Sequence, residues 1–463
     1  MFLFRGRTIN QNRGGRNKYA INMCSGRILP KMLLFAIPLM FSSILQLLFN
    51  AADIIVVGRF AGKESLAAVG STSSLINLLV NLFLVSRYYG SKDEEGISKT
   101  VATSIIVAVV SGVFLTVLGI VFARKILIMM QTPPEVLGLA TLYLVIYFFG
   151  MTPMMLYNFG GAILRAVGDT RRPLIYLSFA GVVNVLLNLF FVIYLHLDVA
   201  GVAIATVIAQ CISAALVLRC LLRESGALRF TPAKARIDVK NLMKMLRIGI
   251  PAGLQGVLFS ISNVVIQAFI NSFGAVVMAG SCASDSIEMF VYFSMEAFYQ
   301  AIISFTSQNM GAGRFDRVNK VLKVGLVCSA LVGGLLGLTA TIFGHTLLGI
   351  YSSSEAVIAA GMERMKLIAS AYAICGLMEG MGGVMRGMGY SVLPTIVTLL
   401  GVCGLRLVWI STLLHIPALH SVATVYISYP VSWAVTFAAH FACFLWVRKR
   451  AFGDFKYGKA GGD

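Results

Sequence analysis

Long apolar segments recur along the whole chain and are separated by short polar ones. Twelve runs of about 20 residues each are long enough to cross a bilayer as helices, at ~1.5 Å per residue. Because lipid cannot satisfy backbone hydrogen bonds, each run is expected to be helical. The runs lie near residues 33–57, 65–86, 100–122, 137–158, 173–195, 199–221, 248–271, 280–306, 321–344, 365–385, 393–414 and 421–447. The pattern predicts an all-α integral membrane protein with twelve transmembrane helices.

Composition supports this class and argues against several others. The 463 residues are 58% hydrophobic and 12% charged, which is too apolar for a single soluble core. The eight cysteines are scattered and form no Cys-x-x-Cys pair, so they are expected to be packing residues and not disulfide or metal ligands. No metalloprotease, hydrolase or nucleotide-loop motif occurs. We therefore expect a protein that is not an enzyme and that uses no cofactor and no metal.

The net charge of +19 is unevenly distributed. If the amino terminus is cytoplasmic, 31 of the 38 Lys and Arg residues fall on the cytoplasmic side of the predicted spans. Six fall on the outer side, at positions 59, 63, 124, 125, 364 and 366. The positive-inside rule therefore predicts that both termini are cytoplasmic. This distribution indicates a lipid bilayer, and not nucleic acid, as the partner of the basic residues.

The two halves of the chain share landmarks at one constant offset in sequence number. Gly90, Arg165, Gly168 and Pro173 in the first half correspond to Gly311, Arg386, Gly389 and Pro394 in the second. Each half has six predicted spans, so both halves enter the membrane from the same side. The pattern predicts two parallel six-helix repeats, with a binding site between or within them near the midplane.

These landmarks divide the chain into five predicted regions. A basic cytoplasmic arm (1–32) precedes a six-helix lobe (33–221), and a basic linker (222–247) leads to a second six-helix lobe (248–447) and a basic tail (448–463). The arm has no sustained apolar run and is expected to be mobile.

One irregularity breaks the repeat. Pro38 and Pro251 open the first span of each half, but they lie closer together than the constant offset requires. The first half therefore lacks eight residues between Pro38 and Gly90. Eight residues correspond to ~12 Å of helix. We predict that the second span stops short, or shifts in depth, at its cytoplasmic end.

The first half places an acid at membrane depth. Asp53 is the only charged residue between Leu33 and Arg59. A charged side chain at this depth costs about 2.5 to 3.5 kcal/mol on insertion scales, and such residues usually face an aqueous cavity and move ions or substrates. The alternative is a protonated Asp53 that hydrogen-bonds to a neighbouring helix.

Other polar residues are expected to lie near this acid. Asn188 follows an opening proline by fifteen residues, as Asp53 does, and it shares one helical face with Asn184. Thr206 and Gln210 are also four residues apart, on the sixth span. We predict that these residues form one polar pocket for substrate or ions. Polar packing between helices is the alternative for the Asn and Thr residues.

The second half carries charges inside its predicted spans. Glu296, Glu379 and Arg406 are candidates for lining a cavity, and a buried neutral carboxyl is the alternative for the two acids. Arg406 needs an internal partner, for which Glu379 is predicted. Asp285 and Glu288 lie nearer the outer end and are predicted to be interfacial.

Three motifs in combination carry a resemblance to a known family. They are Ala-Asp-Ile-Ile-Val-Val-Gly-Arg at 52–59, Arg-Ala-Val-Gly-Asp-Thr-Arg-Arg-Pro at 165–173 and Gln-Asn-Met-Gly-Ala-Gly-Arg at 308–314. Over about residues 33–450 the chain resembles the multidrug and toxic compound extrusion (MATE) transporters of the MOP flippase superfamily. The resemblance implies a V-shaped bundle of two lobes, a monomer, and export of small organic cations or drugs across the plasma membrane in exchange for protons or sodium ions.

The resemblance also assigns residues. The family's acid on the first span matches Asp53, its polar pair on the fifth span matches Asn184 and Asn188, and its threonine on the sixth span matches Thr206. Some members have a second acid where this chain has Asn188, and others have a glutamate where it has Phe259. Fewer acids favour protons over sodium ions as the coupling ion.

The predicted mechanism is a cation-coupled antiporter that works by alternating access. Protonation of Asp53 in the outward-facing state would release a cationic substrate, and deprotonation toward the cytoplasm would reset the site. Two alternatives remain open. One is a lipid-linked oligosaccharide flippase of the same superfamily, which needs several cationic residues in its cavity. The other is a transport-defective remnant, because of the eight missing residues.

Overall fold

Helices make up the regular structure of the part of the chain that the structure describes. The computed structural model describes residues 19–56, 83–129 and 134–456. Nine of the helices in these ranges are long and apolar enough to cross a membrane, and a tenth span results if a pair bent by 45° (Leu137–Phe149 and Met151–Ala166) is counted as one. The predicted helical membrane protein is confirmed to this extent. Most of the second predicted span falls within 57–82, outside the described residues.

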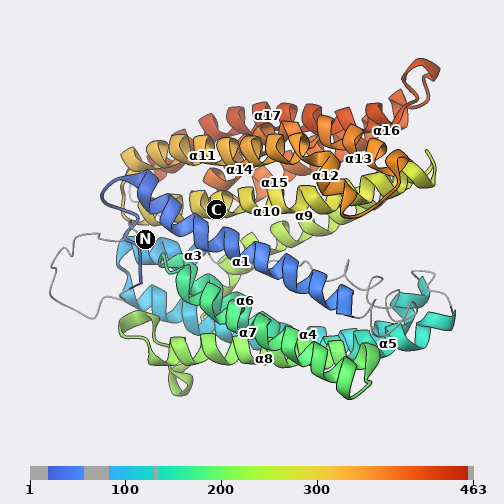
Figure 1. Ribbon diagram of the computed structural model, residues 1–463. Helices are drawn as coiled ribbons and strands as arrows, with labels where there is room; N and C mark the ends of the chain where they lie inside the picture. Colours follow the sequence, from blue (N-terminus) through green and yellow to red (C-terminus); the bar gives the residue numbers. More distant parts are fainter. Residues whose placement is uncertain (1–18, 57–82, 130–133, 457–463) are drawn as a thin grey trace, which may run out of the picture.

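Two groups of helices meet at one end and diverge toward the other, so that the molecule has the outline of a V (Figure 1). The N-terminal lobe consists of α3 (Phe83–Ser91), α4 (Glu94–Met129), α5 (Pro134–Phe149), α6 (Met151–Ala166), α7 (Arg171–Leu189) and α8 (Asp198–Arg223). The C-terminal lobe consists of α9 (Val239–Asn271), α10 (Ala275–Gly311), α11 (Phe315–Ile342), α12 (Gly344–Gly349), α13 (Glu355–Leu367), α14 (Tyr372–Gly387), α15 (Val392–Thr398), α16 (Leu405–Leu413) and α17 (Val422–Lys456).

The helix boundaries of the two lobes repeat at the offset found in the sequence. The first residues of α4, α5, α6 and α7 are Glu94, Pro134, Met151 and Arg171, and their counterparts at that offset are the first residues of α11, α13, α14 and α15, namely Phe315, Glu355, Tyr372 and Val392. Gly168 and Gly389, which precede α7 and α15, both have positive φ, at 94° and 102°. Glycine adopts this conformation without steric cost, so the same tight turn occurs in both lobes.

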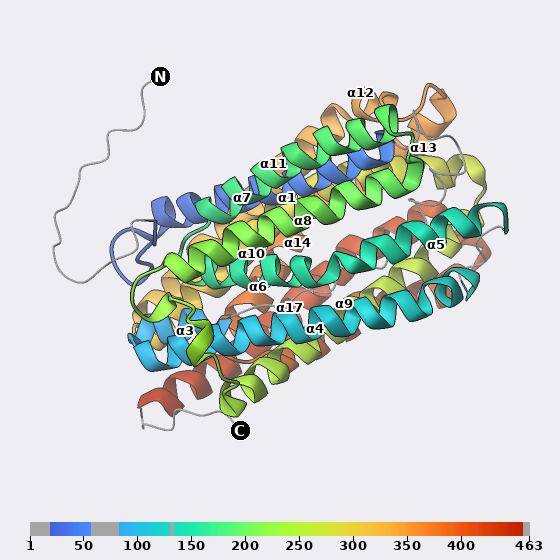
Figure 2. The ribbon, with the colours of Figure 1, turned by 90° about the horizontal axis from the view of Figure 1, so that it is seen from below.

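The first helix of each lobe begins on the other lobe. α1 (Ile28–Val56) starts against α10 and α11, where the rings of Phe35 and Phe305 pack edge to face at 5.9 Å, and then crosses to α7. Figure 2 shows α1, α7 and α8 running side by side. α9 correspondingly starts against the N-terminal lobe, where the backbone N–H of Asp238 donates to Thr103 Oγ1 at 3.0 Å. These crossings tie the lobes together where they converge, at what we call the closed end.

The segment before α1 packs against the C-terminal lobe, although the sequence predicts a mobile basic arm over residues 1–32. The helix begins at Ile28, and Met23 is fully buried. Asn309 Nδ2 and the Arg317 guanidinium donate to the Met23 carbonyl, at 3.2 and 3.3 Å. The sequence of a polar segment cannot reveal such contacts, because the acceptors are backbone carbonyls. Residues 1–18 lie outside the described part.

Two glycines allow the backbones of the two lobes to approach each other closely. A methyl group at Gly90 on α3 would lie 2.0 Å from the carbonyl oxygen of Gln308 on α10, and one at Gly311 would lie 2.0 Å from the carbonyl oxygen of Arg87. The two glycines are repeat equivalents, so the contact is reciprocal. Gln308 Nε2 also donates to the carbonyl of Ala166, at 2.7 Å, which satisfies an oxygen at the end of α6. The backbones of the two lobes can approach this closely only without side chains, as in small-residue helix contacts.

This contact bears on the eight missing residues. α3 ends at Ser91 and α10 ends at Gly311, within one residue of equivalent positions. The second span therefore does not stop short at this end, and that prediction is wrong for the described residues. The eight residues are missing from the stretch between Pro38 and Phe83. Part of this stretch lies outside the described part of the chain.

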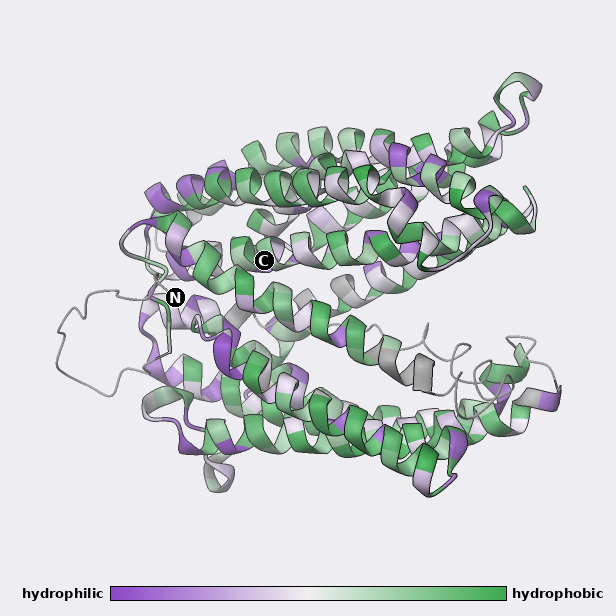
Figure 3. Cartoon of the chain, viewed as in Figure 1, coloured by the Kyte–Doolittle hydropathy of each residue, from purple (hydrophilic) through white to green (hydrophobic). Residues whose placement is uncertain are grey.

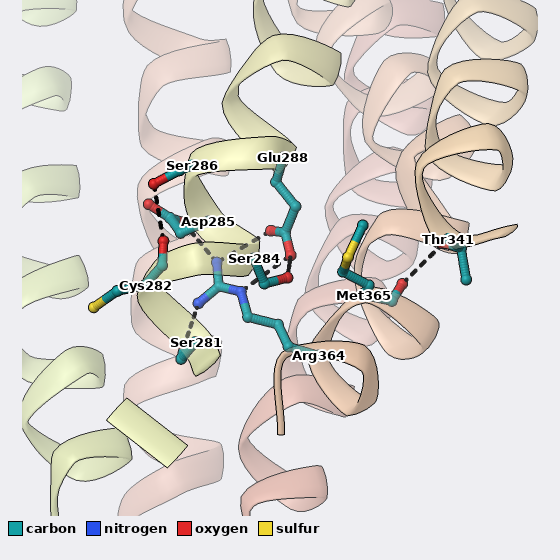
Figure 4. Close-up of polar contacts among 9 residues, drawn as sticks. All are labelled: Ser281, Cys282, Ser284, Asp285, Ser286, Glu288, Thr341, Arg364 and Met365. Carbon is teal, nitrogen blue, oxygen red and sulfur yellow. Dashed lines mark hydrogen bonds and ion pairs between the residues drawn. The ribbon is translucent and has the colours of Figure 1, made fainter. Parts of the chain in front are cut away.

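A buried ion cluster joins α10 to α13 in the C-terminal lobe (Figure 4). Arg364 donates to both carboxylate oxygens of Glu288, at 3.0 and 3.1 Å, and to Asp285 Oδ1 at 2.6 Å. Arg364 and Glu288 are 3% and 2% exposed. The predictions of an outer-loop arginine and of an interfacial Glu288 are wrong here, because these two charges neutralise each other inside the lobe. The side chain of Asp285 is 49% exposed, and its interfacial position stays a prediction.

Prediction for the closed end. Replacing Gly311 by Ala, or Gly90 by Ala, should destabilise the packed lobes by about 1 to 3 kcal/mol, since the added carbon overlaps a backbone carbonyl that cannot move alone. Thermal unfolding of the purified protein in detergent measures this. Gly138→Ala on α5 is the matched control, because nothing lies within 4 Å of a methyl group there. Equal stability of all three variants would contradict the contact.

In the ion cluster, Arg364→Met should reduce the free energy of unfolding by about 3 to 5 kcal/mol, because it leaves a buried carboxylate without a counter-charge. The double variant Arg364→Met with Glu288→Leu should recover most of this loss, whereas Lys366→Met, at an exposed position of the same helix, should change little. Thermal unfolding again reports the effect. A single variant as stable as the parent protein would show that the cluster does not hold α10 to α13.

Candidate functional site

Three of the polar residues predicted for the first lobe form a hydrogen-bonded chain. Asn188 Nδ2 donates to Asn184 Oδ1 at 3.1 Å, and Asn184 Nδ2 donates to Thr206 Oγ1 at 3.2 Å. Asn184 and Asn188 are 5% and 0% exposed. The helical spacing of four residues placed the two amides on one face of α7, and that face turns toward α8. The sequence-predicted neighbours therefore do lie together.

Gln210 is not part of this chain. It lies one turn after Thr206 on α8, and its amide packs against the break between α5 and α6, where a methyl group at Gly150 would lie 2.2 Å from Gln210 Oε1. That oxygen is buried and has no hydrogen-bond partner among the described residues. Gln210 could exchange hydrogen bonds with a ligand or water that reaches the break.

Asp53 belongs to the last turn of α1, but its side chain lies outside the part that the structure describes. The preceding turn is described. The ring of Phe49 occupies the space beside Gly181 on α7, where a methyl group would lie 1.8 Å from a ring carbon. Gly181 is thus the position at which α1 approaches α7, three residues before Asn184.

Two acids and two arginines form a charged cluster across the lobes. Arg165 on α6 interacts electrostatically with Glu296 on α10, Glu296 with Glu379 on α14, and Glu379 with Arg386 on α14. All four side chains are partly exposed. The acids were predicted from their depth in the spans. The two acids are neighbours in this cluster and each has one arginine on its other side, so the cluster contains two charges of each sign.

Arg165 and Arg386 were missed as site residues, although the sequence carried a signal for both. They occupy equivalent positions of the repeat, so each lobe places one arginine at the corresponding point of its fold. Arg386 donates to the Tyr299 hydroxyl, to Gln255 Oε1 and, at 3.3 Å, to Thr395 Oγ1. It thereby connects α14 with α9, α10 and α15.

Arg406 does not pair with Glu379, and that prediction is wrong. Its Nε donates to Ser432 Oγ at 2.8 Å, and its guanidinium lies 3.9 Å from the centre of the Tyr429 ring and 5.6 Å from that of Trp433. The side chain is 4% exposed. A cation held over aromatic faces is stabilised without an acid, so Arg406 contacts α17 and not the charged cluster.

The described residues thus offer a neutral amide and hydroxyl chain in one lobe and a balanced charged cluster that reaches both. Among the described residues, no group of three or more His, Cys, Asp or Glu side chains is arranged to hold a metal ion. Partly exposed acids can attract a cationic molecule, and amides and hydroxyls can orient its polar groups. These chemistries suit binding and release.

Comparisons with known proteins agree with this geometry. The chain is 28% identical to the probable multidrug resistance protein YoeA of Bacillus subtilis, over 90% of this chain and 94% of that protein. It is 22% identical to the multidrug export protein MepA of Staphylococcus haemolyticus, over 78% and 81% of the two chains.

Solved structures share the fold. An outward-facing MATE transporter of the MOP superfamily superposes with a TM-score of 0.86 at 19% identity, over 95% of this chain and all of that chain. A MOP superfamily transporter from Pyrococcus furiosus, described as having a binding pocket of reverse polarity that suggests a different function, superposes with a TM-score of 0.85 at 20% identity, over 94% and 98% of the two chains.

The model of the MatE family matches residues 38–190 and 251–412, one segment in each lobe. These two segments cover most of the chain and include Asn184 and Asn188 of α7, the charged cluster and Asp53. Members of this family are transporters and not enzymes. This multi-pass protein of the cell membrane therefore belongs to the MatE family of multidrug and toxic compound extrusion transporters.

Proposed function

We propose that this protein exports small organic cations across the cell membrane in exchange for protons, by alternating access. One observation carries the proposal: the lobes touch through reciprocal glycines at one end, and helices of both lobes carry partly exposed charges that interact across the lobes. Such an arrangement lets the lobes separate at the closed end without breaking either lobe. The relatives named for multidrug resistance and export support drugs as the class of substrate.

The closed end is assigned to the cytoplasm. Hydrophilic residues gather at this end of the bundle (Figure 3), and the linker between the lobes and the segment before α1 lie there as well. The positive-inside rule favours the cytoplasmic side for such Lys- and Arg-rich segments. The described conformation then corresponds to the outward-facing state of the cycle.

The first lobe supplies the proposed site for substrate and coupling ion. Phe49 meets α7 at Gly181, and both helices begin at the closed end, so the next turn of α1 reaches the level of Asn184. Asp53 is four residues after Phe49, which puts it on the same face of α1. An acid beside buried amides can bind either a cation or a proton, and the two then compete.

The charged cluster favours cations over a pyrophosphate-linked substrate. Arg165 and Arg386 would suit the flippase alternative, but Glu296 and Glu379 lie beside them and balance their charge. Arg406 faces aromatic rings of α17. The cluster therefore offers no surplus of positive charge to an anion, and the antiporter is the function that the geometry supports best.

Prediction for Asp53. Asp53→Asn should reduce ethidium efflux from energised cells to the level of cells without the protein, because the amide keeps the size of the side chain but cannot exchange a proton. Glu363→Gln, at an exposed position of α13, is the control and should export normally. Efflux by Asp53→Asn at the parental rate would refute the site, and a silent parental chain would favour the transport-defective alternative.

Prediction for Glu296. Glu296→Gln should weaken binding of ethidium to the purified protein, since the substitution removes the acid that lies between Arg165 and Glu379. Fluorescence polarisation of ethidium measures the affinity. A neutral hydrophobic dye should bind the variant and the parent equally if the effect is electrostatic, and an equal loss for both ligands would indicate structural damage instead.

A further inference from the structure

A buried histidine in the C-terminal lobe lies between three helices. His440 on α17 is 1% exposed. Its Nδ1 lies 3.2 Å from the carbonyl oxygen of Met378 on α14, and its Nε2 lies 3.3 Å from the carbonyl oxygen of Pro394 on α15 and 3.2 Å from Thr398 Oγ1. The Thr398 hydroxyl can itself donate to the Pro394 carbonyl, at 2.8 Å.

The hydrogen-bond partners of His440 can satisfy both the neutral and the protonated imidazole ring. A carbonyl oxygen only accepts hydrogen bonds, and a neutral imidazole has one N–H and one lone pair. The neutral ring is satisfied if Nδ1–H donates to Met378 and the Thr398 hydroxyl turns to donate to Nε2. The protonated ring is satisfied if both N–H groups donate to the carbonyls of Met378 and Pro394, with the hydroxyl returned to Pro394. The two states differ by one proton and one rotation of a hydroxyl.

Charged groups near the ring come from one helix. On α14, Glu379 follows Met378 in the chain, and the Arg386 charge acts on His440. On α15 and the π-helical turn Leu399–Gly404 that continues it, the side chains are uncharged, and on α17 the nearest turns contribute Thr436 and Cys443. Among the described residues, Arg386 is the charged side chain recorded as acting on the ring, and His440 forms no ion pair with an acid, so an ion pair does not fix the charge of the ring.

In the first lobe a tyrosine, and not a histidine, contacts the equivalent proline carbonyl. Tyr157 occupies the position equivalent to Met378, and its hydroxyl donates to the carbonyl of Pro173 at 3.2 Å. Pro173 is the equivalent of Pro394. A phenol with a reference pKa near 10 keeps its proton at neutral pH, whereas a histidine exchanges one in this range. In the first lobe the proline carbonyl therefore accepts from a group that keeps its proton. In the second lobe the equivalent carbonyl lies beside a group that can exchange its proton.

We propose that His440 is a second proton-binding residue of the transport cycle, which ties α14 to α15 through two carbonyls when protonated and through Thr398 when neutral. The proposal rests on proton-coupled export as the function. α15 continues into a π-helical turn, a wide turn that often marks functional sites, and packs against α9, which crosses to the other lobe. Protonation in the second lobe would thus act on a helix that contacts the first.

The protonation state can be measured without transport. Solid-state NMR of ¹⁵N-histidine-labelled protein in liposomes resolves neutral and charged rings, and His440→Gln identifies the signal among the five histidines. We expect the His440 signal to change from the neutral to the protonated form as the pH is lowered. Thr398→Val should move the midpoint up by about one pH unit, because only the neutral ring loses a donor. A His440 signal that keeps one protonation state from pH 5 to 9, or a midpoint unmoved in Thr398→Val, would overturn the proposal.

The role in transport is tested by the pH dependence of ethidium efflux from vesicles. His440→Gln should flatten the pH profile while efflux continues, and the exposed His415→Gln should leave the profile of the parent protein. An unchanged profile in His440→Gln would overturn the coupling role and leave the antiporter standing. Absence of efflux from the parent protein would instead refute the proposed function, and the NMR titration would still decide whether His440 binds a proton.

Discussion

The reciprocal approach of two glycine backbones at the closed end is the contact on which the rest of the structure depends. Gly90 and Gly311 each lie against a carbonyl oxygen of the opposite lobe, so any side chain at either position would separate the lobes. Around this contact, the Ala166 carbonyl accepts from Gln308 and the Met23 carbonyl accepts from Asn309 and Arg317. Close backbone contacts through small residues thus hold the lobes at this end, together with the side-chain packing of α1 and α9 where they cross to the other lobe.

Charges inside the bundle fall into two kinds. Arg364 and Glu288 are almost completely buried and bind each other bidentately, so they fix α13 on α10. Arg165, Glu296 and Glu379 remain partly exposed and interact across helices without a direct ion pair among the described contacts. A fully paired charge has little left to offer a ligand, whereas a partly exposed one can exchange its neighbours for substrate or water. Burial and pairing, and not charge alone, separate structural residues from candidates for function.

The two lobes share a backbone but differ in chemistry. Equivalent helices begin at one constant offset along the chain, and equivalent glycines turn the chain before α7 and α15. On this common frame the first lobe carries the neutral chain of Asn184, Asn188 and Thr206, and the second carries acids, arginines and a buried histidine. The duplicated fold thus gives two similar bodies, and substitutions at equivalent positions give them different chemistry.

The apolar runs and the constant offset between the halves were enough to predict the helices, the repeat of their boundaries and the neighbourhood of Asn184, Asn188 and Thr206, because helical periodicity and hydropathy are local properties. Partners across helices were not predictable. Arg364 was assigned to a loop and Arg406 to an acid, although the first pairs with the buried Glu288 and the second lies over aromatic rings. The tertiary structure alone decided these pairings, since they depend on which faces of distant helices meet. It also decided that the chain before α1 packs, because the acceptor there is the segment's own Met23 carbonyl, a group that every residue carries and that no sequence pattern distinguishes.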